Sequence, residues 1–133
     1  MPEMKVNLVT PEKSLFDGQA SFLVVPAAEG EIGFLYSHAP IMSSLGKGEV
    51  RIEQGEDKQV VRYAVSGGFI GGDGHRVIIL ATRGECLRDR DPVSVKARIT
   101  ELQGVLKAKA EDTADRGYLE DELAWMQLLE KLL

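Results

Sequence analysis

Hydrophobic and polar residues alternate along the first two thirds of the chain, in short runs separated by glycine or proline. Val6, Leu8 and Thr10 alternate with their neighbours, whereas the runs 60–65 and 77–81 are dense in β-branched residues. Alternation with period two is the pattern of a strand with one buried face. It predicts strands at residues 4–10, 19–25, 31–35, 41–45, 48–54, 58–66, 68–72 and 75–82. Glycine and aspartate, which tolerate positive φ or bond to nearby backbone, predict turns at 17–18, 55–57 and 73–74.

The apolar spacing becomes helical beyond residues 85–91. Asp91 can accept hydrogen bonds from the free backbone amides of a first helical turn, where Pro92 is tolerated because it lacks that amide. The apolar residues of this helix recur every three or four positions: Val95, Ile99, Leu102 and Leu106. Gly104 weakens the helix by about 1 kcal/mol relative to alanine, unless a close packing contact requires it.

A second helix is predicted from Tyr118 to Leu132, after a turn at residues 115–117. Its apolar stripe consists of Leu119, Leu123, Met126 and Leu129. The two stripes can pack together as an antiparallel hairpin. Trp125, Leu128 and Leu132 widen the second stripe, and we expect the surplus apolar surface to contact the strands or a partner, because two helices alone bury little.

These elements predict an α+β fold with two domains. Residues 1–86 form an N-terminal antiparallel flattened β-sandwich or barrel, since short, closely spaced strands usually close on themselves and hide their edges. Residues 87–133 form the C-terminal antiparallel two-helix hairpin.

Composition and charge exclude several classes of function. The chain has 133 residues, 44% of them hydrophobic, and a formal charge of -5. It therefore predicts a folded protein that binds no nucleic acid and no anionic membrane surface, since both need clustered basic residues. The apolar runs are shorter than the roughly 20 residues of a membrane span, so no direct membrane insertion is expected. Cys86 has no disulfide partner in the chain, which favours the cytoplasm.

The residues that could carry chemistry are few. His38 and His75 are far apart in sequence, and a metal site would need both to meet the acidic pair Glu29 and Glu31. Cys86 has no neighbouring histidine to activate it. The glycine pairs at 67–68 and 71–72 lie between strands, so they favour bulges or close backbone contacts over a phosphate site. No enzyme activity and no cofactor are expected.

Several motifs in a fixed order resemble one family, the epsilon subunit of the bacterial F-type ATP synthase. They are EGEIGF at 29–34, HAP at 38–40, GEVRI at 48–52, VSGG at 65–68 and VIILA at 77–81. The resemblance implies a rotor subunit without catalytic activity, which binds the gamma subunit and the ring of c subunits and couples ring rotation to ATP synthesis. It implies a peripheral position at the cytoplasmic face of the cell membrane.

The resemblance also suggests which residues meet these partners. By position in the family, Thr10, His38 and Ser43 would face gamma, and Glu29 and Glu31 would face the polar loops of the c ring. From the residues alone, the acidic pair is a solvated turn, and His38 is a structural residue bonded to backbone beside the rigid Pro40.

In this family the hairpin can extend toward the catalytic alpha/beta head and inhibit ATP hydrolysis. Two departures argue against strong regulation here. Of the motif that opens the first helix in ATP-binding members, only Asp91 remains, so nucleotide binding is doubtful unless another arginine such as Arg98 compensates. The last helix is acidic, which suits an acidic target poorly.

Two other functions remain open. The chain could be a stand-alone β-sandwich adaptor whose hairpin binds an unrelated partner, or a nucleotide-responsive sensor outside the synthase. Copurification with gamma distinguishes a stalk subunit from the adaptor, and tight ATP binding by the isolated chain would favour the sensor.

Overall fold

The computed structural model describes residues 2–109 and 114–133, and the chain divides into two compact units. The first unit, Met1–Cys86, is built of strands, and the second, Leu87–Leu133, is helical. This is the α+β combination that the change in apolar spacing predicts.

Seven strands form the first unit. They are β1 (Met4–Val9), β2 (Ser14–Ala20), β3 (Phe22–Ala27), β4 (Gly30–Phe34), β5 (Ile41–Gln54), β6 (Gln59–Gly72) and β7 (Arg76–Cys86). The sheet order is β2-β1-β7-β6-β5-β3-β4. Neighbouring strands pair antiparallel except β1 and β7, which run parallel, so the sheet is mixed at this one pair.

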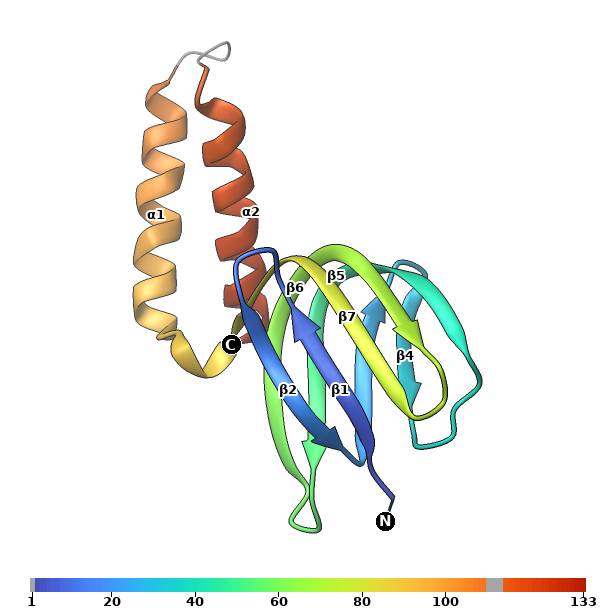
Figure 1. Ribbon diagram of the computed structural model, residues 1–133. Coiled ribbons are helices and arrows are strands. Elements are labelled where there is room, and N and C mark those ends of the chain that lie inside the picture. Colours follow the sequence, from blue (N-terminus) through green and yellow to red (C-terminus); the bar gives the residue numbers. More distant parts are fainter. Residues whose placement is uncertain (1, 110–113) are drawn as a thin grey trace. The chain divides into compact units, whose positions relative to one another are not determined.

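The sheet folds over itself because β5 and β6 are long and strongly bent (Figure 1). The edge strand β2 returns to β5 and β6 in this way. Gln54 Nε2 donates to the Gln19 carbonyl at 3.1 Å, and the Tyr63 hydroxyl donates to the Leu15 carbonyl at 3.2 Å. The rings of Phe16 and Tyr63 meet edge to face. The predicted flattened sandwich is therefore confirmed.

The core of this unit lies between the inward faces of the folded sheet. Met4, Val6 and Leu8 of β1 are fully buried, while the residues between them are at least partly exposed. The same core contains Phe34 of β4 and Ile79 of β7. Alternation in the sequence thus identified the buried face of β1 correctly.

Three details of the predicted strand pattern are wrong. Asp17 and Gly18 do not form a turn but pair with Asn7 and Val6 inside β2, because pairing with β1 overrides the local turn preference. The predicted strand 19–25 is divided at Ser21, whose backbone amide and hydroxyl both donate to the Glu53 carbonyl. The segments 41–45 and 48–54 are one strand, β5, and 58–66 and 68–72 are one strand, β6. The other two predicted turns, at 55–57 and 73–74, lie between strands.

The glycine pairs at 67–68 and 71–72 lie inside β6, so the expectation that they lie between strands is wrong, and Gly68 is the one of the four that needs close backbone contact. Gly68 has φ +130°, and a Cβ at this position would collide with the Leu80 carbonyl of β7. Pairing of β6 with β5 and β7 keeps one register on both sides of this glycine. Close approach is therefore confirmed at Gly68, and the alternative of a register-shifting bulge is wrong there.

The helical unit begins with a 3-10 turn, Leu87–Asp89, followed by α1 (Pro92–Ala108) and α2 (Arg116–Leu132). The Asp91 side chain accepts hydrogen bonds from the amides of Val93 and Ser94, which confirms the predicted cap. All four residues of the predicted first stripe are buried: Val95, Ile99, Leu102 and Leu106. Within the described residues, no helix is both long and apolar enough to cross a membrane.

The second helix starts at Arg116, two positions before the prediction, and packs against α1 as an antiparallel partner (Figure 1). Of its predicted stripe, Met126 and Leu129 are buried, whereas Leu119 and Leu123 are only partly covered. Trp125, predicted to widen the stripe, is buried too. Docking of the hairpin on the sandwich through Trp125 and Leu128 stays a prediction.

Polar contacts close the hairpin where α2 begins. Arg116 Nη1 donates to the Leu106 carbonyl at 3.0 Å and to the Lys109 carbonyl at 3.5 Å, so it caps the end of α1. Its Nε lies 2.9 Å from a carboxylate oxygen of Glu120, and Lys109 pairs with Asp115 at 3.1 Å. A cation at a helix C-terminus is favourable because the free carbonyls carry partial negative charge.

Candidate interaction surfaces

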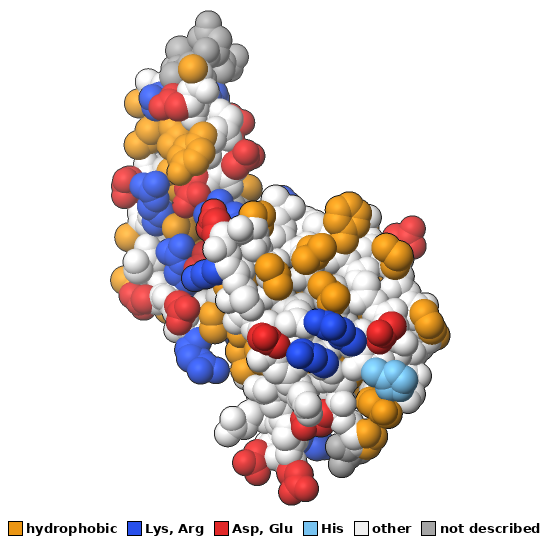
Figure 2. Space-filling model, viewed as in Figure 1, with side chains coloured by type: hydrophobic (Ala, Val, Ile, Leu, Met, Phe, Trp, Pro, Cys, Tyr) orange, Lys and Arg blue, Asp and Glu red, His pale blue; other side chains and the backbone are white. Residues whose placement is uncertain are grey.

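Large apolar side chains are exposed on the outer face of β5, β6 and β7. They form what we call the outer patch: Met42, Phe69, Ile78 and Leu80. Strand pairing places these residues in two rows that cross the strands. In one row, Gly71 of β6 lies between Met42 of β5 and Ile78 of β7, and in the other, Phe69 of β6 pairs with Leu80 of β7. Met42 is 89% exposed and Phe69 65% exposed. Hydrophobic side chains gather on this side of the first unit in Figure 2.

Such a patch differs from scattered apolar residues on a surface. Single exposed hydrophobic residues are normal, but neighbouring ones in adjacent strands mark a place where a partner removes them from water. The signal was present in the sequence. All five residues of the run VIILA at 77–81 are apolar, so this part of β7 is apolar on both faces of the sheet. The inner face, with Val77 and Ile79, is buried in the core, which leaves the outer face for something else.

The three residues predicted to face gamma lie elsewhere. Thr10 is 8% exposed, and its hydroxyl donates to the Lys13 carbonyl at 3.1 Å and accepts from the Lys13 amide at 3.3 Å. Its side chain therefore stabilises the connection between β1 and β2. Ser43 pairs with the buried Ile70, so it occupies the inward phase of β5, opposite in phase to Met42.

His38 is held by its surroundings on several sides. Its Nδ1 lies 3.0 Å from the Leu35 carbonyl, and its Nε2 accepts the Gly74 amide at 3.2 Å, which requires the neutral Nδ1–H tautomer. The ring meets Phe34 edge to face, with centroids 5.0 Å apart. A Cβ at Gly72 would collide with this ring. The structural interpretation of His38 from the residues alone is thus confirmed, while its role toward gamma stays a prediction.

The structure does not gather these three residues into one cluster. Strands β7 and β6 lie between β1, which Thr10 follows, and β5, which holds Ser43. The ring of His75, the second histidine, lies tilted against that of Tyr36, with centroids 5.0 Å apart, instead of meeting His38. Among the residues that the structure describes, no three His, Cys, Asp or Glu side chains converge as metal ligands would.

The acidic turn holds Glu29, in the connection between β3 and β4, and Glu31, the second residue of β4, which pairs with Pro26. Ala27 pairs with Gly30, which leaves a two-residue connection, and Gly30 has φ +136°, a conformation that favours glycine. Both carboxylates are exposed. Arg51 Nη1 of β5 donates to Glu31 Oε2 at 3.3 Å. The predicted turn and strand are confirmed, and one of its two charges has a partner within the chain.

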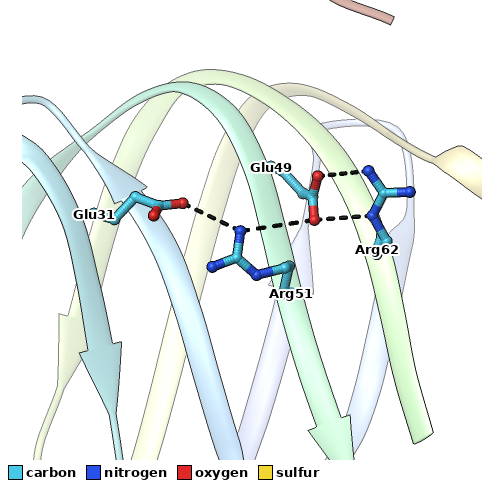
Figure 3. A network of polar contacts seen from close by, with 4 residues as sticks. All are labelled: Glu31, Glu49, Arg51 and Arg62. Atoms are coloured by element: carbon cyan, nitrogen blue, oxygen red, sulfur yellow. Dashed lines mark hydrogen bonds and ion pairs between the residues drawn. The ribbon is translucent and has the colours of Figure 1, made fainter. Parts of the chain in front are cut away.

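Arg51 belongs to a row of alternating charges across β4, β5 and β6 (Figure 3). Arg62 donates to both oxygens of Glu49, from Nε at 2.9 Å and from Nη2 at 2.7 Å. Arg51 Nη1 lies 3.8 Å from Glu49 Oε1. The hydrogen bonds from Arg62 lower the pKa of Glu49 despite partial burial, and Glu49 raises the pKa of Arg62 in return.

The candidate nucleotide contacts are already engaged. Asp91 caps α1, as described above, and Arg98 Nη1 pairs with Glu101 on the same helix at 2.7 Å. Both side chains thus have partners within the helical unit, and their role toward a nucleotide stays a prediction.

Residues 3–86 match the family model described as ATP synthase, Delta/Epsilon chain, beta-sandwich domain. The chain belongs to this ATP synthase family. It is 32% identical to the ATP synthase epsilon chain of Halorhodospira halophila, over 99% of this chain and 96% of the relative. It is 35% identical to the epsilon chain of Alkalilimnicola ehrlichii, over 99% of this chain and 96% of the relative. It is 40% identical to that of Brevibacillus brevis over 73% of each chain.

Two solved structures share the fold. One chain comes from the mitochondrial ATP synthase of Euglena gracilis, in a structure of OSCP, F1 and the c-ring. It has a TM-score of 0.75 at 21% identity, and the match covers 98% of this chain and 81% of that one. The other comes from the central stalk and c-ring of the Tetrahymena thermophila enzyme, with a TM-score of 0.59, 18% identity and coverage of 96% and 94%.

The family model and the full-length epsilon relatives describe different parts of the chain. The model ends at residue 86, where the first compact unit ends. The alignments to the Halorhodospira and Alkalilimnicola epsilon chains extend through 99% of the chain, so they include the helical unit as well.

Proposed function

We propose that this chain is a non-catalytic subunit of the ATP synthase rotor, bound to gamma and to the c ring at the cytoplasmic face of the membrane. The observation that carries the proposal is the outer patch of a chain that belongs to the epsilon family. A subunit of a rotor has to hold a partner tightly through repeated rotation. An exposed apolar surface on a rigid sheet suits that task, since its burial supplies affinity and its backbone does not need to reorganise.

The gamma contact is assigned to the outer patch. Its residues come from three hydrogen-bonded strands, so their relative positions are fixed before a partner arrives. The family resemblance suggested that three other residues contact gamma directly: Thr10, His38 and Ser43. Under this assignment they act mainly by shaping the adjoining loops and the edge of the sheet. His38, for example, joins the loop before β5 to the loop after β6 through the Gly74 amide.

The c ring contact is assigned to the acidic turn. Glu29 lies in the tight connection between β3 and β4, Glu31 lies beside it at the start of β4, and paired carboxylates favour a partner with basic or amide side chains. This contact sets orientation more than affinity, because both carboxylates stay largely in water.

Copurification tests the gamma assignment directly. Phe69→Glu combined with Leu80→Glu should abolish recovery of gamma with the tagged chain from solubilised membranes, since two charges would be desolvated in the interface. Val60→Glu is the matched control, because Val60 is also an exposed apolar residue of β6, at 48%, but lies outside the patch. Undiminished recovery with the double variant, or equal loss with the control, would show that gamma does not bind here.

The hairpin is assigned a regulatory role, for which the alpha/beta head is the partner that the family resemblance implies. Asp91 and Arg98 have partners within their own helix region, so tight ATP binding is not expected. A chain truncated after Cys86 should still support ATP synthesis in reconstituted membranes, with a small change in hydrolysis. If gamma does not copurify with the complete chain at all, the stand-alone adaptor becomes the better description.

A further inference from the structure

Arg51 is shared between two carboxylates. Its Nη1 lies 3.3 Å from Glu31 Oε2 and 3.8 Å from Glu49 Oε1, so neither contact is a short hydrogen bond (Figure 3). The Arg51 side chain is 40% exposed and that of Glu31 is 57% exposed. An ion pair this open to water is weak, and a competing cation can replace it at small cost.

Glu49 is the better anchored of the two carboxylates. Its side chain is 11% exposed, and Arg62 binds both of its oxygens. A carboxylate offers about four acceptor positions, so two remain for a second guanidinium. The low pKa of Glu49 keeps it ionised through the neutral range. Glu49 can therefore receive Arg51 fully without losing Arg62.

The sheet places these groups so that only Arg51 needs to move. Glu49 and Arg51 are two residues apart on β5 and share one face, and Arg51 is directly opposite Arg62 of β6. Glu31 comes from β4, on the other side of β3. A change of side-chain rotamer carries the Arg51 guanidinium from one carboxylate to the other while every backbone hydrogen bond stays in place.

We infer that Arg51 is a displaceable counter-ion: a Lys or Arg side chain of the partner takes its place on Glu31, and Arg51 transfers to Glu49. This inference rests on the proposed function, which places the acidic turn against the c ring. In both states Glu31, Glu49, Arg51 and Arg62 each have a partner, so docking leaves none of these four charges unpaired. In the free chain Arg51 partly neutralises Glu31, which lowers the attraction for unrelated cationic surfaces and favours a partner whose basic group is placed to compete.

Rebinding of the full chain to a solubilised stalk and ring complex, stripped of its own copy of this subunit, tests the exchange. Binding of the unaltered chain tests the proposed function. Glu31→Gln should weaken binding, whereas Arg51→Gln should tighten it about two- to fivefold, because a competing surface ion pair is removed. Lys58→Gln, at the β5–β6 turn, removes the same charge elsewhere and should change affinity less.

The outcomes separate the exchange from the proposed function. If the unaltered chain binds but Arg51→Gln weakens binding as Glu31→Gln does, Arg51 is a fixed support, and the exchange is wrong while the function stands. If Lys58→Gln tightens binding as much as Arg51→Gln, the effect is one of net charge, and the exchange is wrong again.

A crystal structure of the Glu31→Gln chain decides the matter even if no complex forms. Loss of the Glu31 charge imitates its capture by a partner, so the distance from Arg51 Nη1 to Glu49 Oε1 should fall from 3.8 Å to hydrogen-bond range, about 3 Å. An Arg51 side chain that turns to solvent instead would overturn the exchange.

Discussion

The two units of this chain are stabilised in different ways. The sandwich unites residues far apart in sequence through a seven-stranded sheet, and its core includes residues from every strand of that sheet. Within the hairpin, the two helices share one interface, the helices hold seven buried residues, and Arg116 caps the end of α1. A sheet with one shared core tends to unfold as a whole, whereas two helices can separate at one interface. The difference suits a division between a rigid part that binds and a part that can rearrange.

The strongest test of this comparison is to make matched cavities in the two units. Ile79→Ala in the sandwich and Leu102→Ala in the hairpin each truncate a side chain that is at most 1% exposed, so each should cost about 2–5 kcal/mol locally. Trp125 is the one tryptophan of the chain and lies on α2, so its fluorescence reports on the hairpin. Leu102→Ala should lower the urea midpoint seen by fluorescence and leave slow-exchanging sandwich amides protected.

Ile79→Ala should have the converse effect, with loss of amide protection in the sandwich. If either substitution lowers both transitions equally, the two units unfold together, and the proposed division is wrong.

Loss of the Arg116 cap should open the hairpin with a smaller effect. Arg116→Gln leaves the Leu106 and Lys109 carbonyls without their charged donor and should destabilise the hairpin by about 1 kcal/mol. Arg98→Gln is the control, because Arg98 contacts Glu101 on its own helix and should contribute only about 0.3–0.5 kcal/mol. Hydrogen exchange of the α1 amides measures both, and equal effects would mean that Arg116 does not hold the helices together.

Gly104 offers a test in the opposite direction. It is exposed, and a Cβ there would meet nothing within 4 Å outside its own helix backbone. The close packing contact that could have required this glycine is therefore not present among its described neighbours. Gly104→Ala should stabilise the hairpin by about 0.5–1 kcal/mol, measured by the fluorescence midpoint. Gly68→Ala provides the contrast, since a Cβ at that position would collide with the Leu80 carbonyl and should destabilise the sandwich.

Local features of this chain could be predicted from sequence, and non-local ones could not. The Asp91 cap and the stripe from Val95 to Leu106 depend on residues a few positions apart, so their pattern was sufficient. The strand at Asp17 and Gly18 depends on pairing with β1. The parallel pairing of β1 with β7 joins the first strand of the chain to the last one. No local preference encodes such pairings.

The candidate interaction surfaces show the same limit. The acidic turn was found because glycine and the two glutamates are adjacent in sequence. The outer patch was missed, since Met42, Phe69 and Leu80 become neighbours only through the register of β5, β6 and β7. Family position suggested Thr10 for the gamma contact, but only the structure shows that its hydroxyl already serves the turn after β1.

The smallest expected effect concerns the pH dependence of the sandwich. Bonding to Arg62 lowers the pKa of Glu49 in the folded chain, so its ionic contacts contribute stability above the ordinary glutamate pKa, about 4.3, and lose it as the pH falls through the folded value. The contribution should be below about 1 kcal/mol, because Arg62 is 42% exposed. Urea midpoints of the unaltered chain and of Glu49→Gln should differ at pH 7, and the difference should shrink as the pH falls below the ordinary glutamate pKa. The pKa of Asp73 is also lowered, by the amides of His75 and Arg76, and its effect is common to both chains and cancels in the comparison. A difference that does not shrink as the pH is lowered until the unaltered chain unfolds would mean that Glu49 acts through packing rather than through its charge.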